Sequence, residues 1–279
     1  MTIDSITDGP GVASINRSTW SRPDTLELFV GTEGWQDAGE RASLVAVAPK
    51  VRGGRLLDVG VGGGRTVSLL KLLSDDYVGV DYTPEMVELC RRQHPDVDIR
   101  VGDARDLGDF ADSTFALAFF SWNGIDAVDH GDRLKILHEL ARVVRPGGYL
   151  LFSSHNREGF AYGQAPWRRM RGSGSRVHRF LRFVARLPRN APGYVRRWPN
   201  WLRNRRLHKD NGDWAIHSTD AHDFGIVVFF TTMRNERREL EAAGFEDTVV
   251  FASTTGERFV PGADTSTADH LYFLARRAG

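Results

Sequence analysis

The 279-residue sequence contains a single cysteine, Cys90, only four lysines, and no run of eighteen apolar residues. One cysteine cannot build a disulfide framework or a thiolate metal cluster within one chain. The first residues, MTIDSITDGPG, lack a basic stretch followed by an apolar one, so neither secretion nor a membrane span is expected. We therefore expect a soluble, cytoplasmic protein without a membrane partner.

Acidic residues are nearly absent from one long segment, although the formal net charge of the chain is only +1. Residues 157–209 contain fifteen arginines and lysines and one acid, Glu158, so the remainder of the chain is net acidic. A general preference for arginine over lysine does not explain why acids are missing there. The segment is compatible with an anionic partner.

Short apolar runs alternate with helix-like segments through the first half of the chain. Each run is bounded by Gly or Asp, and they cover 55–60, 76–81, 98–103, 115–121 and 148–154. Strands buried on both faces of a parallel sheet have this appearance. Helices are predicted before them at 24–30 and 38–48, the second with Leu44, Val45 and Val47 at packing positions. The pattern predicts a doubly wound α/β domain.

The alternation stops after the fifth predicted strand. Within the basic segment, apolar residues at helical spacing predict an amphipathic helix over 177–187. Regular structure returns at 223–232, followed by a helix over 233–243 that Gly244 closes. The last two predicted strands, 247–253 and 269–277, form a hairpin.

The strongest local signal is LLDVGVGGGR, residues 56–65, in which a strand continues into a glycine loop and a helix. Glycine permits positive φ and lets a ligand approach main-chain N–H groups at a helix start. Dinucleotide-binding enzymes have a third glycine where this chain has Arg65, and the Asp58 carboxylate is unfavourable beside a pyrophosphate. An acid at this position suits a cationic ligand.

Acidic and polar residues end the next three strands. Asp81, about twenty residues after the loop, can accept hydrogen bonds from both hydroxyls of a ribose. Asp103, followed by Ala104, ends the third strand, where a side chain can accept from an adenine amino group. The sequence SWNG, residues 121–124, ends the fourth.

The segments DVGVGGGR, VGVDYTPEM, VGDARDL, FFSWNGID and RVVRPGGYLLFSSHN together resemble the class I S-adenosylmethionine-dependent methyltransferases. The resemblance covers residues 40–156 closely and 231–277 loosely. It implies a Rossmann-like, mostly parallel seven-stranded sheet with a reversed terminal hairpin. It also implies S-adenosylmethionine as the cofactor, S-adenosylhomocysteine as its product, and an α-helical lid inserted after the fifth strand, as in similar small-molecule methyltransferases.

The resemblance divides the chain into four parts. They are an N-terminal helical cover (1–50), the cofactor-binding core (51–156), a basic lid insertion with a return strand (157–230), and a C-terminal helix with the closing hairpin of the core (231–279). In the N-terminal part, Trp20 and Trp35 are candidates to close over the cofactor, although spacing alone does not place them.

The resemblance also implies which residues contact the cofactor. Those around the methionine part, the ribose, the adenine and the sulfonium are Asp58, Gly60, Gly62, Gly64, Arg65, Asp81, Tyr82, Met86, Asp103, Ala104, Arg105, Ser121, Trp122 and Asn123. In this set Arg65 would reach the methionine carboxylate, and Tyr82 and Met86 would flank the adenine. The alternatives are a plain tight turn for the glycines, loop caps for the acids, core packing for Tyr82 and Met86, and a solvated side chain for Arg65.

Histidines are the candidate catalytic residues. Methyl transfer from a sulfonium is an in-line displacement that alignment can promote, but a hydroxyl or ammonium acceptor must also lose a proton. His155, at the carboxyl end of the fifth strand, is the first candidate base, with a hydrogen bond to a loop backbone as the alternative. His217 and His222 form a second set. Their spacing with Asp223 does not support a metal site, so no metal is expected.

The leading hypothesis is O- or N-methylation of a small molecule, such as a specialised metabolite. The basic segment contains Trp167, Trp198, Trp201 and Trp214, which suit an aromatic or apolar acceptor, and its arginines suit an anionic one. Alternatively, these residues pack and solvate the lid itself. The sequence leaves the methylated atom, the need for a base and the oligomeric state open.

Two other hypotheses use the basic segment differently. The first is RNA methylation, which is disfavoured because SWNG stands where an Asn-Pro-Pro-Tyr-like motif would follow the fourth strand. The second is a non-catalytic protein whose amphipathic helix docks on an anionic membrane or protein surface. Pro188 and Pro192 shorten that helix and make this the weakest of the three hypotheses.

Overall fold

The computed structural model describes residues 11–166 and 196–279. Its helices and 3-10 helices are α1 (Val12–Trp20), α2 (Pro23–Leu26), η1 (Glu27–Phe29), α3 (Ala38–Val51), α4 (Val67–Lys71), α5 (Pro84–Gln93), η2 (Gly124–Ala127), α6 (His130–Val143), η4 (Arg205–Leu207), η5 (Ala221–Phe224) and α8 (Met233–Ala242). Its strands are β1 (Leu56–Val59), β2 (Tyr77–Asp81), β3 (Asp98–Val101), β4 (Phe115–Phe120), β5 (Val144–Asn156), β6 (Lys209–Asp210), β7 (Trp214–Ser218), β8 (Val227–Thr231), β9 (Phe245–Ala252), β10 (Arg258–Phe259) and β11 (His270–Arg277).

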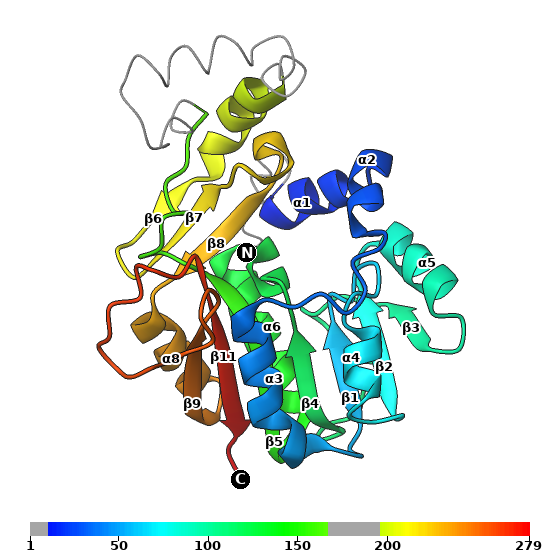
Figure 1. Ribbon diagram of the computed structural model, residues 1–279. Helices are drawn as coiled ribbons and strands as arrows, with labels where there is room; N and C mark the ends of the chain where they lie inside the picture. The colour runs from blue at the N-terminus through cyan, green and yellow to red at the C-terminus, as the bar shows by residue number, and fades with distance from the viewer. Residues whose placement is uncertain (1–10, 167–195) are drawn as a thin grey trace, which may run out of the picture.

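The strands form one sheet whose main path runs β10-β9-β11-β5-β4-β1-β2-β3 (Figure 1). Strands β1 to β5 are parallel, and β11 lies antiparallel between β5 and β9. This arrangement confirms the expected doubly wound α/β fold with a reversed terminal hairpin. The helix predicted over 233–243 is α8, and Gly244 follows it with φ of +93°.

The sheet is wider than the seven strands implied by the resemblance, because β6, β7, β8 and β10 extend it. Strand β4 ends at Phe120, opposite Phe152, whereas β5 continues to Asn156. The last two residues of β5, His155 and Asn156, extend beyond β4 and pair with β8. Strand β8 pairs in turn with β7, and β7 pairs with β6. In the described part of the segment between β5 and α8, the strands β6, β7 and β8 therefore belong to the sheet, so the insertion is not purely helical.

Helices cover both faces of the sheet, and successive residues of β1 enter different apolar clusters. Leu56 packs with residues of α3, α4 and α5, whereas Leu57 packs with residues of α6 and α8. In α3, Leu44 and Val47 are buried as expected, but Val45 is 69% exposed because it lies on the solvent side of that helix. The amphipathic helix predicted over 177–187 lies outside the described residues.

The cover of the core is formed by chain segments from both sides of the insertion. In Figure 1, α1 and α2 lie on one side and the β6–β8 extension on the other, above the carboxyl ends of the parallel strands. Asn16 of α1 joins the two, because its Nδ2 donates to Ala127 O and Val227 O at 2.9 and 2.7 Å. In the described part of the chain, no helix is long and apolar enough to cross a membrane.

A buried ion network ties α6 to α8 beneath this cover. Arg133 is fully buried, and its guanidinium nitrogens lie 2.6 Å from Asp126 Oδ1 and 2.6 Å from Glu236 Oε2. Its charge also lies 4.8 Å from the ring centroid of Phe229. The two carboxylates depend on this one cation, because removing one member of a buried ionic group leaves the others uncompensated.

We expect Arg133→Ala to lower the free energy of unfolding by about 3–5 kcal/mol, the usual cost of breaking a buried ion pair. Urea denaturation followed by circular dichroism measures this value. The control is Lys135→Ala on the same helix, whose side chain is 66% exposed and is expected to change stability by less than about 1 kcal/mol. Equal stability losses in the two variants would contradict the assigned role of the network.

Candidate functional site

The glycine loop after β1 places backbone, rather than side chains, at the edge of a cavity. Gly60 and Gly62 line the cavity and have φ values of +65° and +55°, in the left-handed region that glycine adopts without strain. A Cβ on Gly60 would lie 2.7 Å from the Phe120 ring. Glycine is therefore required at position 60 both by the positive φ of the backbone and by the close approach of the Phe120 ring at the end of β4.

Asp81, the last residue of β2, is held in position by two backbone donors. Its Oδ2 accepts from Gly62 N at 3.0 Å and its Oδ1 accepts from Thr83 N at 2.8 Å. The residue is only 7% exposed, and burial raises the pKa of its carboxyl group, although the two backbone hydrogen bonds oppose this shift. The sequence prediction of a strand-end carboxylate facing a ligand site is consistent with this geometry.

The next polar group lies at the end of β3. Asp103 pairs with Arg105 at 2.6 Å, and Arg105 also pairs with Asp132 at 2.6 Å. Burial by itself raises the pKa of the Asp103 carboxyl group. The hydrogen bonds from Arg105 together have a larger, opposite effect, so the pKa of Asp103 lies below its ordinary value. Asp103, Ala104 and Arg105 line the same cavity as Asp81.

Residues after β4 close another side of the cavity in a strained conformation. Trp122 and Asn123 have φ values of +51° and +57°, which non-glycine residues rarely adopt. Asn123 N donates to Ser153 Oγ at 2.8 Å, and this bond holds the turn against β5. Ser121, Trp122 and Asn123 all line the cavity, as expected from the sequence.

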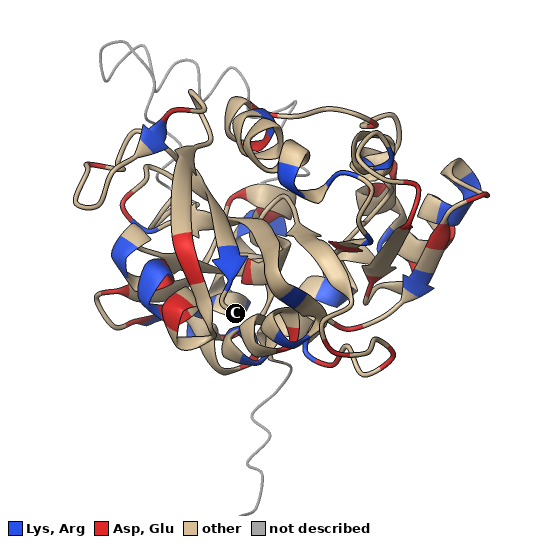
Figure 2. Ribbon diagram, turned by 90° about the horizontal axis from the view of Figure 1, so that it is seen from below, with Lys and Arg blue, Asp and Glu red and all other residues tan. Residues whose placement is uncertain are grey.

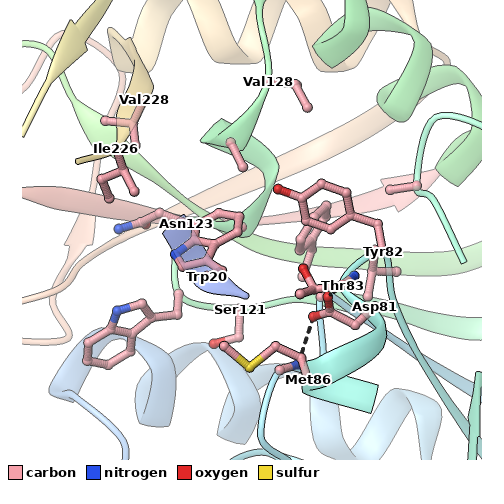
Figure 3. A pocket seen from close by; sticks show the side chains of 18 of the residues that line it. Trp20, Asp81, Tyr82, Thr83, Met86, Ser121, Asn123, Val128, Ile226 and Val228 are labelled. Carbon is pink, nitrogen blue, oxygen red and sulfur yellow. Dashed lines mark hydrogen bonds between the residues drawn. The ribbon is translucent and has the colours of Figure 1, made fainter. Parts of the chain in front are cut away.

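The cavity has a volume of about 240 Å³ and joins a polar end to an apolar end. In Figure 3, Asp81, Tyr82 and Thr83 lie on one side and Ile226 and Val228 on the opposite side. Met86 and Trp20 also line it, whereas Trp35 does not. Residues that sequence reasoning did not assign to the site are Phe29, Val59, Thr83, Gly102, Phe120, Gly124, Ala127, Val128, Ile136, Thr219, Ala221, Ile226 and Val228.

His155 lines the cavity and is oriented by a buried carboxylate. Its Nδ1 lies 2.8 Å from Asp126 Oδ2, and its backbone N donates to the same oxygen at 2.6 Å. The other oxygen, Asp126 Oδ1, accepts from Arg133 and from Ser154 Oγ at 2.6 and 2.7 Å. The His155 side chain thus lies at the end of β5 and is hydrogen-bonded to a carboxylate. The sequence did not predict Asp126 as its partner.

Four predicted site residues do not line the cavity: Asp58, Gly64, Arg65 and His217. A Cβ on Gly64 would lie 2.6 Å from the His94 ring, so this glycine serves the packing of α5. His217 stacks on His208 at a centroid distance of 3.9 Å, away from the set that includes His155 and His222. His217 and His222 were grouped because they are close in the sequence. In the structure His217 lies on β7 outside the cavity, whereas His222 lies in the turn between β7 and β8 and lines the cavity.

Arg65 faces the N-terminal cover instead of the cavity. Its two terminal nitrogens lie 2.7 and 2.8 Å from the carboxylate oxygens of Glu40, which is fully buried, and it also donates to Ser121 Oγ. A buried carboxylate needs such a partner. The expected contact with a methionine carboxylate is therefore not supported, and Arg65 instead joins α3 to the glycine loop.

Asp58 points into the protein rather than towards a ligand. It is 1% exposed, and its Oδ2 accepts from Thr66 Oγ1 at 2.6 Å and from Tyr77 Oη at 2.8 Å. Burial raises the pKa of Asp58 to about 7, against the lowering effect of these two hydrogen bonds. Its predicted contact with the cofactor is replaced by a role beneath the glycine loop.

The raised pKa of Asp58 predicts a pH-dependent effect of Asp58→Asn. Between about pH 4 and 7 the folded protein binds more protons at this site than the unfolded chain, so this group's contribution to stability falls as pH rises. We expect the stability of the variant relative to the parent to increase across this window and to level off above it. Urea denaturation at several pH values measures the difference.

Asp98→Asn is the control for this experiment. The hydrogen bond from Arg100 holds the pKa of Asp98 below its ordinary value, so its contribution is lost as pH falls and has the opposite sign. A pH-independent difference between Asp58→Asn and the parent would contradict the assignment of Asp58 as a group with a raised pKa.

No group of three or more His, Cys, Asp or Glu side chains within residues 11–166 and 196–279 is arranged to hold a metal ion. His222 lines the cavity, whereas Asp223 is 3.8 Å from Arg197.

The strand order, the reversed β11, the glycine loop and the strand-end carboxylates define the class I methyltransferase fold. Residues 57–152 match the protein family described as "Methyltransferase domain", which covers β1 to most of β5. Residues 57–152 therefore contain a methyltransferase domain, and the chain has the class I methyltransferase fold.

Comparisons with individual proteins agree with this class. The chain is 32% identical over 156 residues to phthiotriol/phenolphthiotriol dimycocerosates methyltransferase 1 of Mycobacterium ulcerans, with 53% of this chain and 56% of the relative covered. It is 32% identical over 120 residues to demethylmenaquinone methyltransferase of Renibacterium salmoninarum, with 43% and 49% covered. The chain thus spans about half the length of these curated relatives.

Among solved structures, the chain resembles the 1,6-didemethyltoxoflavin-N1-methyltransferase of Burkholderia thailandensis, determined with its substrate and S-adenosylhomocysteine bound. The TM-score is 0.57 with 16% identity, and 100% of this chain and 99% of that chain are covered. At this identity the likeness concerns the fold alone.

Proposed function

We propose that the protein transfers a methyl group from S-adenosylmethionine to an oxygen or nitrogen atom of a small molecule with an uncharged, largely apolar body. One observation carries this proposal. A single cavity contains the strand-end carboxylates Asp81 and Asp103 at one end and the carboxylate-bound imidazole of His155 at another. The first pair suits a nucleoside with a cationic sulfur, and the imidazole suits an acceptor that must lose a proton.

Polar atoms without partners support the fit of the nucleoside. Tyr82 Oη and Asn123 Oδ1 are buried and make no hydrogen bond with the described residues, although buried polar groups are normally paired. Both residues line the cavity. Asp81 would hold the ribose, Asp103 and the following residues the adenine, and Gly60 and Gly62 the methionine part. When bound, the cofactor supplies an electrophilic methyl group on a sulfonium.

His155 is the proposed general base. Because its Nδ1 is bonded to Asp126, its Nε2 is the ring nitrogen left to accept a proton from the acceptor. Arg133 fixes Asp126, so the imidazole is oriented through two buried residues. The side chain is 19% exposed, which leaves the ring accessible from the cavity.

The described walls favour an aromatic or apolar acceptor over an anionic one. Ala127, Val128, Ile136, Ile226 and Val228 supply apolar surface. Among the described residues, Arg105 is the one arginine in the cavity lining, which includes no lysine. Its charge is already balanced by Asp103 and Asp132. The relatives named above include a phthiotriol/phenolphthiotriol dimycocerosates methyltransferase and a demethylmenaquinone methyltransferase.

RNA as the acceptor receives less support from the described residues. Arg157, Arg196 and Arg197 of the basic segment pair with Asp210, Asp24 and Asp223. Figure 2 shows acidic and basic segments interspersed over the described ribbon. These arginines are therefore partly neutralised, whereas RNA binding needs cations that can pair with phosphates.

The experiment that tests this function uses S-adenosylmethionine carrying an isotopically labelled methyl group. Purified protein is incubated with it and a panel of neutral phenols, quinols and aromatic amines. The expected result is one or more products heavier by a labelled methyl group, with S-adenosylhomocysteine formed in equal amount. Tight binding of S-adenosylhomocysteine without any labelled product from the panel would contradict the proposed acceptor class, and absence of binding would contradict methyl transfer itself.

A further inference from the structure

A strained turn forms part of the wall between β7 and β8. His222, Asp223 and Phe224 have φ values of +50°, +56° and +59° in succession. Left-handed conformations are unfavourable for non-glycine residues and persist only where the surroundings impose them. Three consecutive residues of this kind indicate that the turn is held by specific contacts.

Those contacts come from two segments that are distant in the sequence. Asn204 is fully buried, and its Nδ2 donates to Phe224 O at 2.9 Å, while Asn200 Nδ2 donates to Asp223 O at 3.0 Å. Both asparagines belong to the helical residues 196–204, which lie within the basic segment. From the other side, Thr19 of α1 donates through Oγ1 to Gly225 O at 2.8 Å.

The turn presents polar groups to an otherwise apolar part of the cavity. Thr219 and His222 line the cavity next to Ile226 and Val228, which Figure 3 shows across from Asp81. Thr219 is 6% exposed, and its Oγ1 makes no hydrogen bond with the described residues. Burial lowers the pKa of His222, so its imidazole is neutral near pH 7 and offers both a donor and an acceptor nitrogen.

We propose that Thr219 and His222 form an acceptor-recognition site for a hydroxyl or carbonyl substituent on an otherwise apolar ring system, and that Asn200 and Asn204 are its positioning residues. An unpaired buried hydroxyl loses the hydration it has in water, so a ligand that supplies the missing partner is preferred over an analogue that lacks it. This inference rests on the proposed function, because it concerns the acceptor end of the same cavity. It assigns that end a chemical selectivity for neutral molecules with a polar substituent.

The test compares two fluorescent probes, 2-naphthol and naphthalene, which differ by one hydroxyl group. Their dissociation constants are measured by fluorescence titration in the presence of saturating S-adenosylhomocysteine. We expect the parent protein to prefer 2-naphthol by about tenfold, the value of one net hydrogen bond. Thr219→Val and His222→Phe keep the approximate shape and should reduce this preference to about threefold or less.

Asn200→Ala and Asn204→Ala test the positioning residues by the same ratio. Each should reduce the preference for 2-naphthol while leaving the affinity for S-adenosylhomocysteine within about twofold, because the polar end of the cavity is not altered. Asn200 is only partly buried, so its variant provides the result if Asn204→Ala fails to fold. The control is Thr255→Val, an exposed threonine outside the cavity, which should keep the parental ratio.

The outcomes separate this inference from the proposed function. An unchanged probe ratio in Thr219→Val and His222→Phe, or no binding of either probe to a parent protein that binds S-adenosylhomocysteine, would overturn the recognition site alone. Parental ratios in Asn200→Ala and in a folded Asn204→Ala would overturn the positioning role. Failure of the parent protein to bind S-adenosylhomocysteine would instead contradict the proposed methyl transfer.

Discussion

Asp81→Ala is expected to weaken S-adenosylhomocysteine binding by at least about 100-fold. The carboxylate is buried and fixed by Gly62 N and Thr83 N, so it is preorganised to accept hydrogen bonds from a ribose diol. Hydrogen bonds to a charged group contribute about 1.5–3 kcal/mol each, and 1.4 kcal/mol corresponds to a factor of ten in affinity. The substitution removes two such bonds and also releases the glycine loop. Isothermal titration calorimetry measures the dissociation constant.

Two further variants show whether this effect is specific to the carboxylate. Asp81→Asn keeps one acceptor oxygen and should give an intermediate affinity. Asp98→Ala removes a half-exposed carboxylate that pairs with Arg100 at the start of β3, outside the cavity, and should bind like the parent protein. An Asp81→Ala affinity within about threefold of the parental value would refute the ribose assignment, since one charged hydrogen bond alone exceeds that difference.

His155→Ala should lower the rate of methyl transfer by about 10²–10⁴-fold, the range that a positioned general base contributes. The affinity for S-adenosylhomocysteine should stay unchanged, because His155 lies on β5 whereas the proposed cofactor contacts follow β1 to β4. The measurement is the steady-state rate with a hydroxyl acceptor found in the labelled-methyl experiment.

Chemical rescue distinguishes a base from a merely structural histidine. Imidazole added to His155→Ala can occupy the space of the missing ring and accept the proton, so part of the rate should return. His138→Ala is the control, because His138 is on the exposed face of α6 and does not line the cavity. A His155→Ala enzyme with parental turnover would show that the acceptor does not need this base.

Local sequence patterns were sufficient to predict the elements around the site. The glycine loop, the strand-end acids Asp81 and Asp103, and the turn after β4 are encoded within short stretches, because backbone conformation and strand ends depend on neighbouring residues. Parallel strands then bring these ends to one edge of the sheet, which is why Asp81, Asp103 and Ser121 line one cavity. The predicted C-terminal hairpin of β9 and β11 was also correct, because its two strands were visible as short local patterns.

Side chains whose roles depend on partners far along the chain were not predictable in this way. Arg65 pairs with Glu40, 25 residues earlier, and His155 is oriented by Asp126, 29 residues earlier. Spacing in the sequence does not state which of several nearby carboxylates a buried cation or imidazole will meet. Asp58 shows the same limit, since its direction follows from hydroxyl donors on Thr66 and Tyr77.

The amino-acid sequence by itself determined the class of fold, the edge of the sheet where the cavity lies and the identity of most polar residues there, because these follow from short-range backbone preferences and the order of strands. Only the tertiary structure decided which residues form the apolar end of the cavity. That wall combines α1, β8 and the turn at 219–225, and Asn204 Nδ2 reaches Phe224 O across 20 residues to hold it. Such a wall exists only after the chain has packed, since its strained turn is stable through contacts rather than through local propensity.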